Sequence, residues 1–176
     1  MLDAAQAIVL EQGATRLTLD AVAKHSGTSK GGVMYNFPSK EALLRAMIER
    51  LVAHNREAHA MTTATLPAGP SQSLKAYVMN SIRAPDADDR ISGALLAALA
   101  ADPALLKPVA DYFAARFAVL SKELPLEQAA LVHLATEGLW ILELLQVSPF
   151  SPKQRSRIIT QLLHYAEHGL PGTQAP

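Results

Sequence analysis

The segment 18–44, TLDAVAKHSGTSKGGVMYNFPSKEALL, constrains the fold more than any other part of the chain. Leu19, Val22 and Ala23 recur at the spacing of one helix face, which predicts a short helix with one buried stripe. Gly27 follows this helix and permits the positive φ of a sharp turn, because glycine has no Cβ. The pattern therefore predicts a short helix that ends in a tight turn.

A second short helix follows the turn, and its buried face would hold Val33 and Phe37. Pro38 ends this helix, because the residue before a proline is pushed out of the α region. Ser39 can then cap a third helix that continues through Leu51. Two short helices joined by a glycine turn form a helix-turn-helix, which offers its second helix to the major groove of DNA.

At these residues the chain resembles the tetracycline-repressor (TetR) family of bacterial transcriptional regulators. The resemblance covers residues 2–51. It rests on an ordered set of short matches: Ala21-Val22-Ala23, Ser26-Gly27, Ser29-Lys30-Gly31, Tyr35, Phe37 and Ser39-Lys40-Glu41-Ala42-Leu43. The rest of the chain resembles the family only in helical content and length.

The resemblance and the helical pattern together predict an all-α fold. We expect an N-terminal three-helix helix-turn-helix DNA-binding domain at 1–45 and a C-terminal helical ligand-binding and dimerisation domain at 46–176. The polar segment 62–73 is the best candidate for a linker, because it contains proline and glycine. The family resemblance further implies a homodimer on double-stranded DNA, most simply a repressor that a small-molecule ligand releases from a palindromic operator.

The predicted DNA-binding segment is basic, although the net charge of the whole chain is zero. Residues 24–40 contain three lysines, His25 and no acid, and the distribution of charge matters more than its sum. Lys40 begins the third helix, where its charge and the helix N-terminus could both face a phosphate. The residues assigned to DNA contacts are Thr18, Thr28, Ser29, Lys30, Gly31, Gly32, Tyr35, Asn36 and Lys40. Two alternatives stay open: an ordinary solvated face, and a core position for Tyr35.

Gly31 and Gly32 are unusual inside so short a helix, since each costs about 1 kcal/mol relative to alanine. We hypothesise that the missing side chains let the helix backbone approach the groove closely. Fewer side chains would then remain to read bases, and the main readers would be Thr28, Lys30 and Asn36.

The predicted helix around residues 139–145 is apolar on all sides, interrupted only by Glu143. A helix of this kind must be buried on every side. A neighbouring helix of the same chain can cover one face, and a second subunit would cover the other, as in a four-helix dimer interface. The predicted interface residues are Leu134, Ile141, Leu145, Ile158, Ile159 and Leu162. A monomer whose middle helices cover both faces is the alternative.

Aromatic and polar residues in the middle helices could line a small-molecule site with a few polar anchors. The candidates are Tyr77, Tyr112, Phe113, Phe117, His133, Glu137 and Trp140. A filled core would use the same residues. Glu137 and Glu143 on an apolar helix hint at a cationic or hydrogen-bond-donating ligand.

Other functional classes find little support in the sequence. The pairs His133/Glu137 and His164/His168 lack a third metal ligand at recognisable spacing, and no nucleophile motif or phosphate-binding loop is present. We therefore predict no enzymatic activity, no metal and no cofactor. Zero cysteines, no secretory signal and no membrane-spanning run fit a cytoplasmic protein.

A further alternative is a helical dimer that binds ligands or partners, with weak or no binding to DNA. Met34 supports it, because many members of the family have an aromatic residue at that position and a thioether cannot donate to a phosphate. The intact pattern from Tyr35 to Leu44 argues against it.

Overall fold

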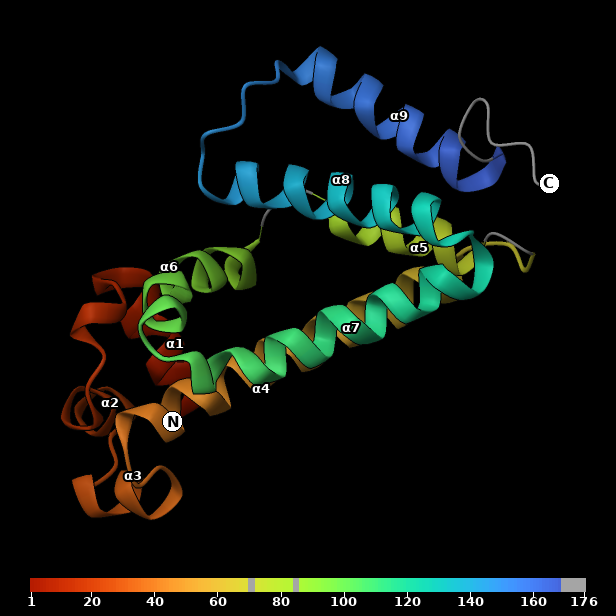
Figure 1. Cartoon of the computed structure of the whole chain (residues 1–176). Coiled ribbons are helices and arrows are strands. Elements are labelled where there is room, and N and C mark those ends of the chain that lie inside the picture. Colours follow the sequence, from red (N-terminus) through yellow and green to blue (C-terminus); the bar gives the residue numbers. More distant parts are fainter. Residues whose placement is uncertain (70–71, 84–85, 169–176) are drawn as a thin grey trace. The chain divides into compact units, whose positions relative to one another are not determined.

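The computed structural model describes residues 1–69, 72–83 and 86–168 (Figure 1). These residues form helices joined by short loops and contain no strand, so the predicted all-α class is confirmed. The helices are α1 (Leu2–Gln12), η1 (Ala14–Arg16), α2 (Leu19–Ser26), α3 (Lys30–Asn36), α4 (Lys40–Thr65), α5 (Gln72–Ser81), α6 (Ala87–Ala101), η2 (Pro103–Leu105), α7 (Leu106–Glu123), α8 (Leu126–Leu144) and α9 (Pro152–His168).

The predicted helix-turn-helix is present as α2 and α3, and local hydrogen bonds define its ends. The hydroxyl of Thr18 accepts a hydrogen bond from the Ala21 amide at 3.0 Å and caps α2. Gly27 ends α2 in the left-handed conformation, with φ 69 and ψ 16. The hydroxyl of Ser29 then caps α3 by accepting from the Gly32 amide at 3.1 Å. Each boundary therefore follows from the side chain that the sequence places there.

Helix α4 is longer than the sequence pattern predicts. Ser39 caps its start, since its hydroxyl accepts from the Ala42 amide at 3.1 Å. The helix then continues to Thr65 and so includes the first four residues of the segment expected to be a linker. The hydroxyls of Thr62 and Thr63 bond to backbone carbonyls one turn earlier, which lets these polar residues stay within the helix.

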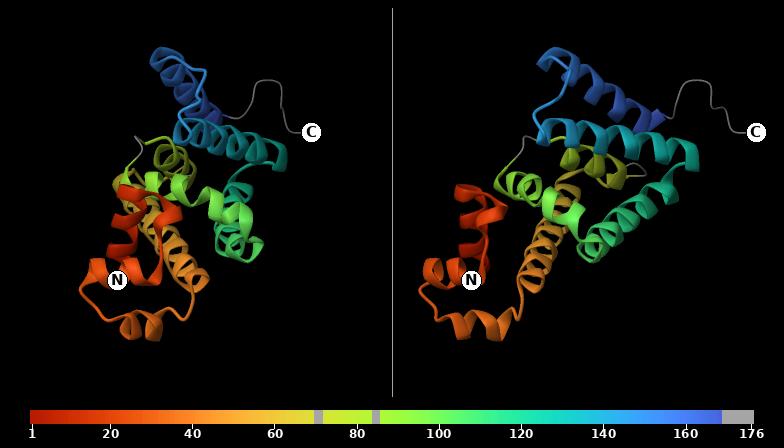
Figure 2. Two further views of the ribbon diagram at one scale, coloured as in Figure 1. Left: turned by 90° about the vertical axis from the view of Figure 1, so that its left-hand side faces the viewer. Right: turned by 60° about the vertical axis from the view of Figure 1, so that its left-hand side comes forward.

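The chain packs as two compact units. The first unit contains Met1–His54 and Pro85–Asp111. Its buried core combines residues from α1 to α4 with Ile91 and Leu95 of α6 and with Leu105. Helix α6 lies beside α1 (Figures 1 and 2), so a helix from the middle of the sequence completes the core around the helix-turn-helix. The predicted functional division at residue 45 stays a prediction, whereas the packing follows these discontinuous segments.

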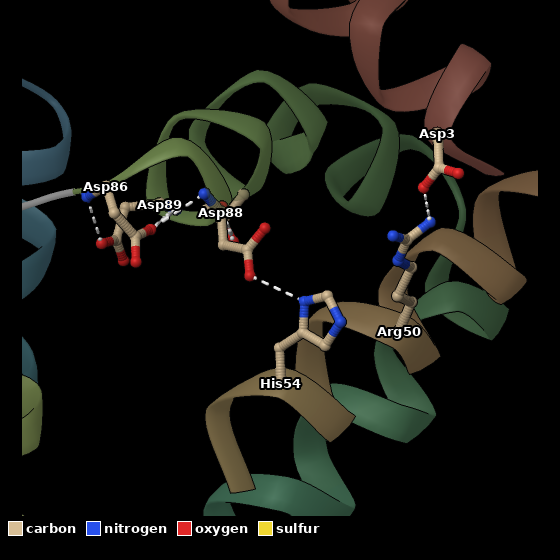
Figure 3. Close-up of polar contacts among 7 residues, drawn as sticks. Asp3, Arg50, His54, Asp86, Asp88 and Asp89 are labelled. Atoms are coloured by element: carbon tan, nitrogen blue, oxygen red, sulfur yellow. Dashed lines mark hydrogen bonds and ion pairs between the residues drawn. The ribbon is translucent and has the colours of Figure 1, made fainter. Parts of the chain in front are cut away.

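Polar contacts join α4 to its two neighbours in the first unit (Figure 3). Arg50 and Asp3 form an ion pair at 2.5 Å, which links α4 to α1. Nδ1 of His54 lies 3.0 Å from Oδ2 of Asp88, which links α4 to α6. The carboxylate of Asp86 caps α6 by accepting from the Asp88 amide at 2.9 Å, and acids at a helix N-terminus are favoured by the helix dipole.

The second unit contains Asn55–Ala84 and Tyr112–Pro176. Helices α5, α8 and α9 pack on one another, and α9 lies next to α8 (Figure 2). The buried core of this unit comprises Leu74, Tyr77, Val78, Leu120, Ala129, Val132 and Leu162. At the start of α9, the Ser151 amide donates to the Gln154 side chain at 2.8 Å and the Gln154 amide donates to the Ser151 hydroxyl at 3.4 Å. This reciprocal pair is a capping box.

Candidate functional site

Helix α3 presents its side chains to solvent in the first unit. Val33 is buried and holds the helix against the core, while Tyr35 is 90% exposed. A core position for Tyr35 is therefore excluded. Thr28, Lys30 and the other predicted contact residues are exposed or half-buried around the same helix. This part of the chain offers a short helix whose outer face is free to meet another molecule.

Several of the predicted DNA-contacting side chains have partners within the chain. The hydroxyls of Thr18 and Ser29 serve as helix caps. Nζ of Lys30 lies 3.0 Å from Oδ1 of Asp20, and both side chains are more than half exposed. An exposed pair of this kind contributes little stability, so Lys30 can exchange the carboxylate for a phosphate at low cost. Nδ2 of Asn36 donates to the backbone carbonyl of Gly32 at 3.0 Å.

The fold itself does not require glycine at positions 31 and 32. Positive φ is confined to Gly13, Gly27 and Gln146 among the described residues. A Cβ added to Gly32 would meet Oγ of Ser29 at 3.4 Å, which is an ordinary van der Waals contact, and one added to Gly31 would meet it at 4.0 Å. Neither packing nor backbone conformation therefore explains the two glycines.

A second group of polar residues is centred on Tyr77 of α5. The Tyr77 hydroxyl donates to Oε1 of Glu137 at 2.7 Å and lies 2.6 Å from Nδ1 of His133. A hydroxyl has only one hydrogen, and a carboxylate can only accept, so Nδ1 of His133 must be the donor in the second bond. Burial, together with the Glu137 carboxylate, raises the pKa of Tyr77 and keeps the phenol protonated.

Arg116 of α7 completes this polar cluster. Its Cζ atom lies 4.2 Å above the ring centroid of Tyr77 and 5.3 Å from that of Tyr112, a cation–π arrangement on both sides. Nη1 donates to the Tyr112 hydroxyl at 2.7 Å, and Nη2 contacts the Ser81 hydroxyl. Nη2 also lies 3.6 Å from Oε1 of Glu137. Burial lowers the pKa of the guanidinium, but Tyr112, Tyr77 and Glu137 outweigh this effect and leave the pKa raised.

Two buried nitrogen atoms near the cluster have no hydrogen-bond partner in the described part of the chain: Nε of Arg116 and Nδ1 of His59. Burial, and secondarily the charge of Arg116, lowers the pKa of His59. Burial followed by the same guanidinium also lowers the pKa of His133, although Glu137 opposes the shift. Both imidazoles are therefore neutral at pH 7.

Aromatic rings surround His133 on its other sides. Its ring centroid lies 5.5 Å from that of Phe117 and 6.0 Å from that of Phe113, the latter edge-on. Six of the seven predicted ligand-binding residues thus come together: Tyr77, Tyr112, Phe113, Phe117, His133 and Glu137. The seventh, Trp140, is half-buried one turn beyond Glu137 on α8.

Arg116, Ser81 and His59 belong to the cluster but were not predicted. Arg116 could have been found from the sequence, because it is the one cation between Tyr112 and Phe117 and lies one turn after Tyr112. Ser81 and His59 carry no such signal, since their proximity depends on how the helices pack.

Glu143, for which the sequence hints at a cationic or hydrogen-bond-donating ligand, is paired within the chain, and its role toward a ligand stays a prediction. Glu143 forms a two-point ion pair with Arg155 of α9: Nε contacts Oε1, and Nη2 lies 2.9 Å from Oε2. Nη2 also donates to the backbone carbonyl of Ile82 at 2.7 Å. Arg155 therefore ties α9 both to α8, through Glu143, and to the segment that follows α5, through Ile82.

The predicted dimer residues fall into two groups. Leu134 on α8 and Leu145 directly after it are 66% and 50% exposed, and Ile141 and Ile159 are half-buried. Ile158 packs against the core of its own unit, and Leu162 is buried within it. The exposed apolar residues of α8 are thus those that a second subunit could cover.

Within the described residues, no helix is both long and apolar enough to cross a membrane. The same part of the chain contains no group of three histidine or carboxylate side chains placed to hold a metal ion.

Known proteins resemble the chain in sequence and in fold. Residues 1–47 match the family of bacterial regulatory proteins of the tetR type, and residues 71–167 match the tetracycline repressor-like C-terminal domain. No curated protein sequence matches significantly.

Solved structures show the same fold over almost the whole chain. A Rhodococcus protein described as a TetR-family transcriptional regulator is 19% identical, with a TM-score of 0.72 and 94% of each chain covered. A transcriptional regulator from Streptomyces coelicolor A3(2) is 19% identical, with a TM-score of 0.74 and coverage of 94% and 95%. The multidrug binding protein EbrR, in complex with ethidium, is 23% identical, with a TM-score of 0.67 and coverage of 92% and 95%.

The two domain matches together span both the helix-turn-helix and the C-terminal helices, and the structural neighbours share the arrangement throughout. The chain therefore belongs to the TetR family of transcriptional regulators.

Proposed function

We propose that this protein is a homodimeric, sequence-specific DNA-binding regulator that represses transcription until a small molecule releases it from a palindromic operator. The observation that carries the proposal is the exposed outer face of α3, with Tyr35 90% exposed above a buried Val33. Thr28, Lys30 and Asn36 would read bases, and Lys40 would hold a phosphate at the start of α4. The regulator acts in the cytoplasm and has no catalytic activity.

Two arguments support dimerisation: the two-fold symmetry of a palindromic operator and the exposed leucines of the second unit. One short recognition helix makes few contacts, whereas two helices related by a two-fold axis read half-sites about one helical turn apart. Leu134 on α8 and Leu145 directly after it supply an apolar surface that a symmetric copy can bury, and the half-buried Ile141 and Ile159 are the further interface candidates.

A small-molecule effector is supported by the polar cluster around Tyr77 and by two structural neighbours. EbrR binds ethidium, and FrrA, 23% identical with a TM-score of 0.64, is a flavonoid-responsive regulator. The ligand must bind the DNA-incompetent conformation better than the competent one, since only differential affinity shifts a population. Helix α4 contributes Lys40 to the first unit and His59 to the second, so it is the element through which the change would travel.

The test is fluorescence anisotropy with DNA that flanks the protein's own gene, across a salt series, beside Lys40→Ala. We expect specific binding that weakens with salt. In Lys40→Ala, affinity should fall and the slope of log affinity against log salt should decrease by about 1. Lys153→Ala, an exposed lysine of α9, is the matched control and should bind as the parent does. Equal affinity for every DNA sequence, or no binding to DNA, would refute the proposal that this protein is a sequence-specific regulator.

A further inference from the structure

The polar cluster contains an acceptor on His133 that the described residues leave without a donor. Nδ1 of His133 donates to the Tyr77 hydroxyl, so in the neutral imidazole Nε2 carries the lone pair. No described residue donates to that atom, and His133 is only half-buried. Phe113 and Phe117, which are also half-buried, flank the ring. The half-buried imidazole therefore presents an acceptor among aromatic rings.

The guanidinium of Arg116 is largely taken up by the chain itself. Arg116 contacts Tyr112, Ser81 and Glu137 through its two Nη atoms. Its Nε–H is buried beyond the reach of solvent. A ligand carboxylate would therefore have to compete with these three neighbours for the guanidinium.

The charges of the cluster also cancel. The guanidinium of Arg116 and the carboxylate of Glu137 lie 3.6 Å apart, and Tyr77 donates to the same carboxylate oxygen. His133 adds no charge while it is neutral. A cationic ligand would consequently gain no net electrostatic attraction, and an anionic one would gain none either.

We propose that the effector is an uncharged aromatic compound with a hydroxyl group, which packs against Phe113 and Phe117 and donates its hydrogen to Nε2 of His133. The assignment rests on the proposed effector site and narrows its ligand class. Tyr77 and Glu137 act as positioning residues, since they fix the tautomer that leaves Nε2 as an acceptor.

Three probes of one shape separate the possibilities: 2-naphthol, 2-methoxynaphthalene and 2-naphthoate, each titrated into the purified full-length protein by isothermal calorimetry. The first has a hydrogen to donate, the second lacks it, and the third carries a negative charge. We expect 2-naphthol to bind about tenfold more tightly than 2-methoxynaphthalene, the loss expected for one buried hydrogen bond. The carboxylate should bind more weakly than both.

The variant His133→Phe keeps an aromatic ring but removes the acceptor, so the preference for 2-naphthol should disappear. His25→Phe, the same substitution at an exposed site of α2, should retain it. Equal affinity of the first two probes, a preference for the carboxylate, no binding of any probe, or an unchanged preference in His133→Phe would each overturn the proposal.

A pH series on the unaltered protein gives an answer even if His133→Phe does not fold. The hydroxyl of 2-naphthol stays protonated in mild acid, whereas protonation of His133 turns its acceptor into a donor. The groups that face this imidazole are Tyr77, Glu137 and Arg116. The preference for 2-naphthol should fade once the pH falls below the pKa of His133, which burial holds below its ordinary value. A preference that persists after the imidazole is protonated would refute the acceptor role.

These titrations contain no DNA, so their outcome is independent of the regulator proposal. Binding of 2-naphthol without operator binding would leave the ligand assignment intact and refute the regulator. Operator binding without any binding of the probes would support the regulator and refute the ligand assignment.

Discussion

Gly32 is the residue at which DNA binding and stability can be separated most sharply. Gly32→Ala should stabilise α3 by about 1 kcal/mol, because alanine has the higher helix propensity and its Cβ meets Ser29 Oγ at an ordinary 3.4 Å. If close approach to the groove explains the glycine, affinity for the operator should fall at the same time. Urea denaturation and anisotropy on the same samples measure the two effects. Unchanged or improved affinity would end the close-approach hypothesis.

His59 makes stability depend on pH. Burial and the charge of Arg116 lower its pKa in the folded state, so the unfolded chain binds the proton more readily. The resulting stability is complete above the unfolded pKa of about 6.5 and is lost as the pH falls toward the folded value. The loss cannot exceed about 1.4 kcal/mol per pH unit for one proton.

The substitution His59→Gln removes this titration. Its free energy of unfolding should fall less steeply than that of the parent between pH 7 and pH 5, as measured by urea denaturation at each pH. His25→Gln, at an exposed site of α2, should follow the parent curve. Parallel curves for His59→Gln and the parent would show that His59 titrates normally.

Among the elements, α9 is held to the second unit by one arginine as well as by its apolar face. Arg155 contacts both oxygens of Glu143 and the carbonyl of Ile82. Lysine keeps the charge but cannot make this forked arrangement, so Arg155→Lys should destabilise the protein by about 1–2 kcal/mol. Arg157→Lys, on an exposed position of the same helix, is the control for denaturation curves. Equal stability of the two variants would contradict this role for Arg155.

The elements also show which features a sequence can predict. Thr18, Ser29 and Ser39 each cap a helix by accepting from an amide three residues later, so their role is local and could be predicted. The packing of α6 against α1 is not local, and its alanine-rich sequence fits many partners. The aromatic residues around His133 could be predicted as a group from composition. The contacts of Arg116 with Tyr77 and Tyr112 could not be predicted, because they depend on how the helices pack.

For the whole molecule, the first unit depends on residues far along the chain. Leu95 of α6 is buried in the same core as Ile8 and Leu43. Leu95→Ala should therefore cost about 2–5 kcal/mol and weaken operator binding, although it lies outside the helix-turn-helix. Leu10→Ala, at a more exposed position on α1, should cost much less. Thermal denaturation and anisotropy would measure both, and a neutral Leu95→Ala would place α6 outside the cooperative core.

Assembly is tested on α8. Leu134 is 66% exposed, so Leu134→Glu should leave each subunit folded while its charge opposes burial against a partner. Sedimentation velocity should show a monomer with unchanged helical content, and operator affinity should drop by orders of magnitude. Met61→Glu, at an exposed site on α4, should remain dimeric. A dimeric Leu134→Glu would move the interface elsewhere.

The discontinuous core of the first unit sets a rule for building hybrid sensors from this protein. A graft that exchanges only residues 1–47 would import foreign counterparts of Ile8 and Leu43 but keep the native Ile91 and Leu95. The boundary between foreign and native residues would then run through the middle of one hydrophobic core. A functional chimera must therefore carry α6 together with the helix-turn-helix. Otherwise the core residues at that boundary must be redesigned to fit one another before the ligand response of the chimera can be adjusted.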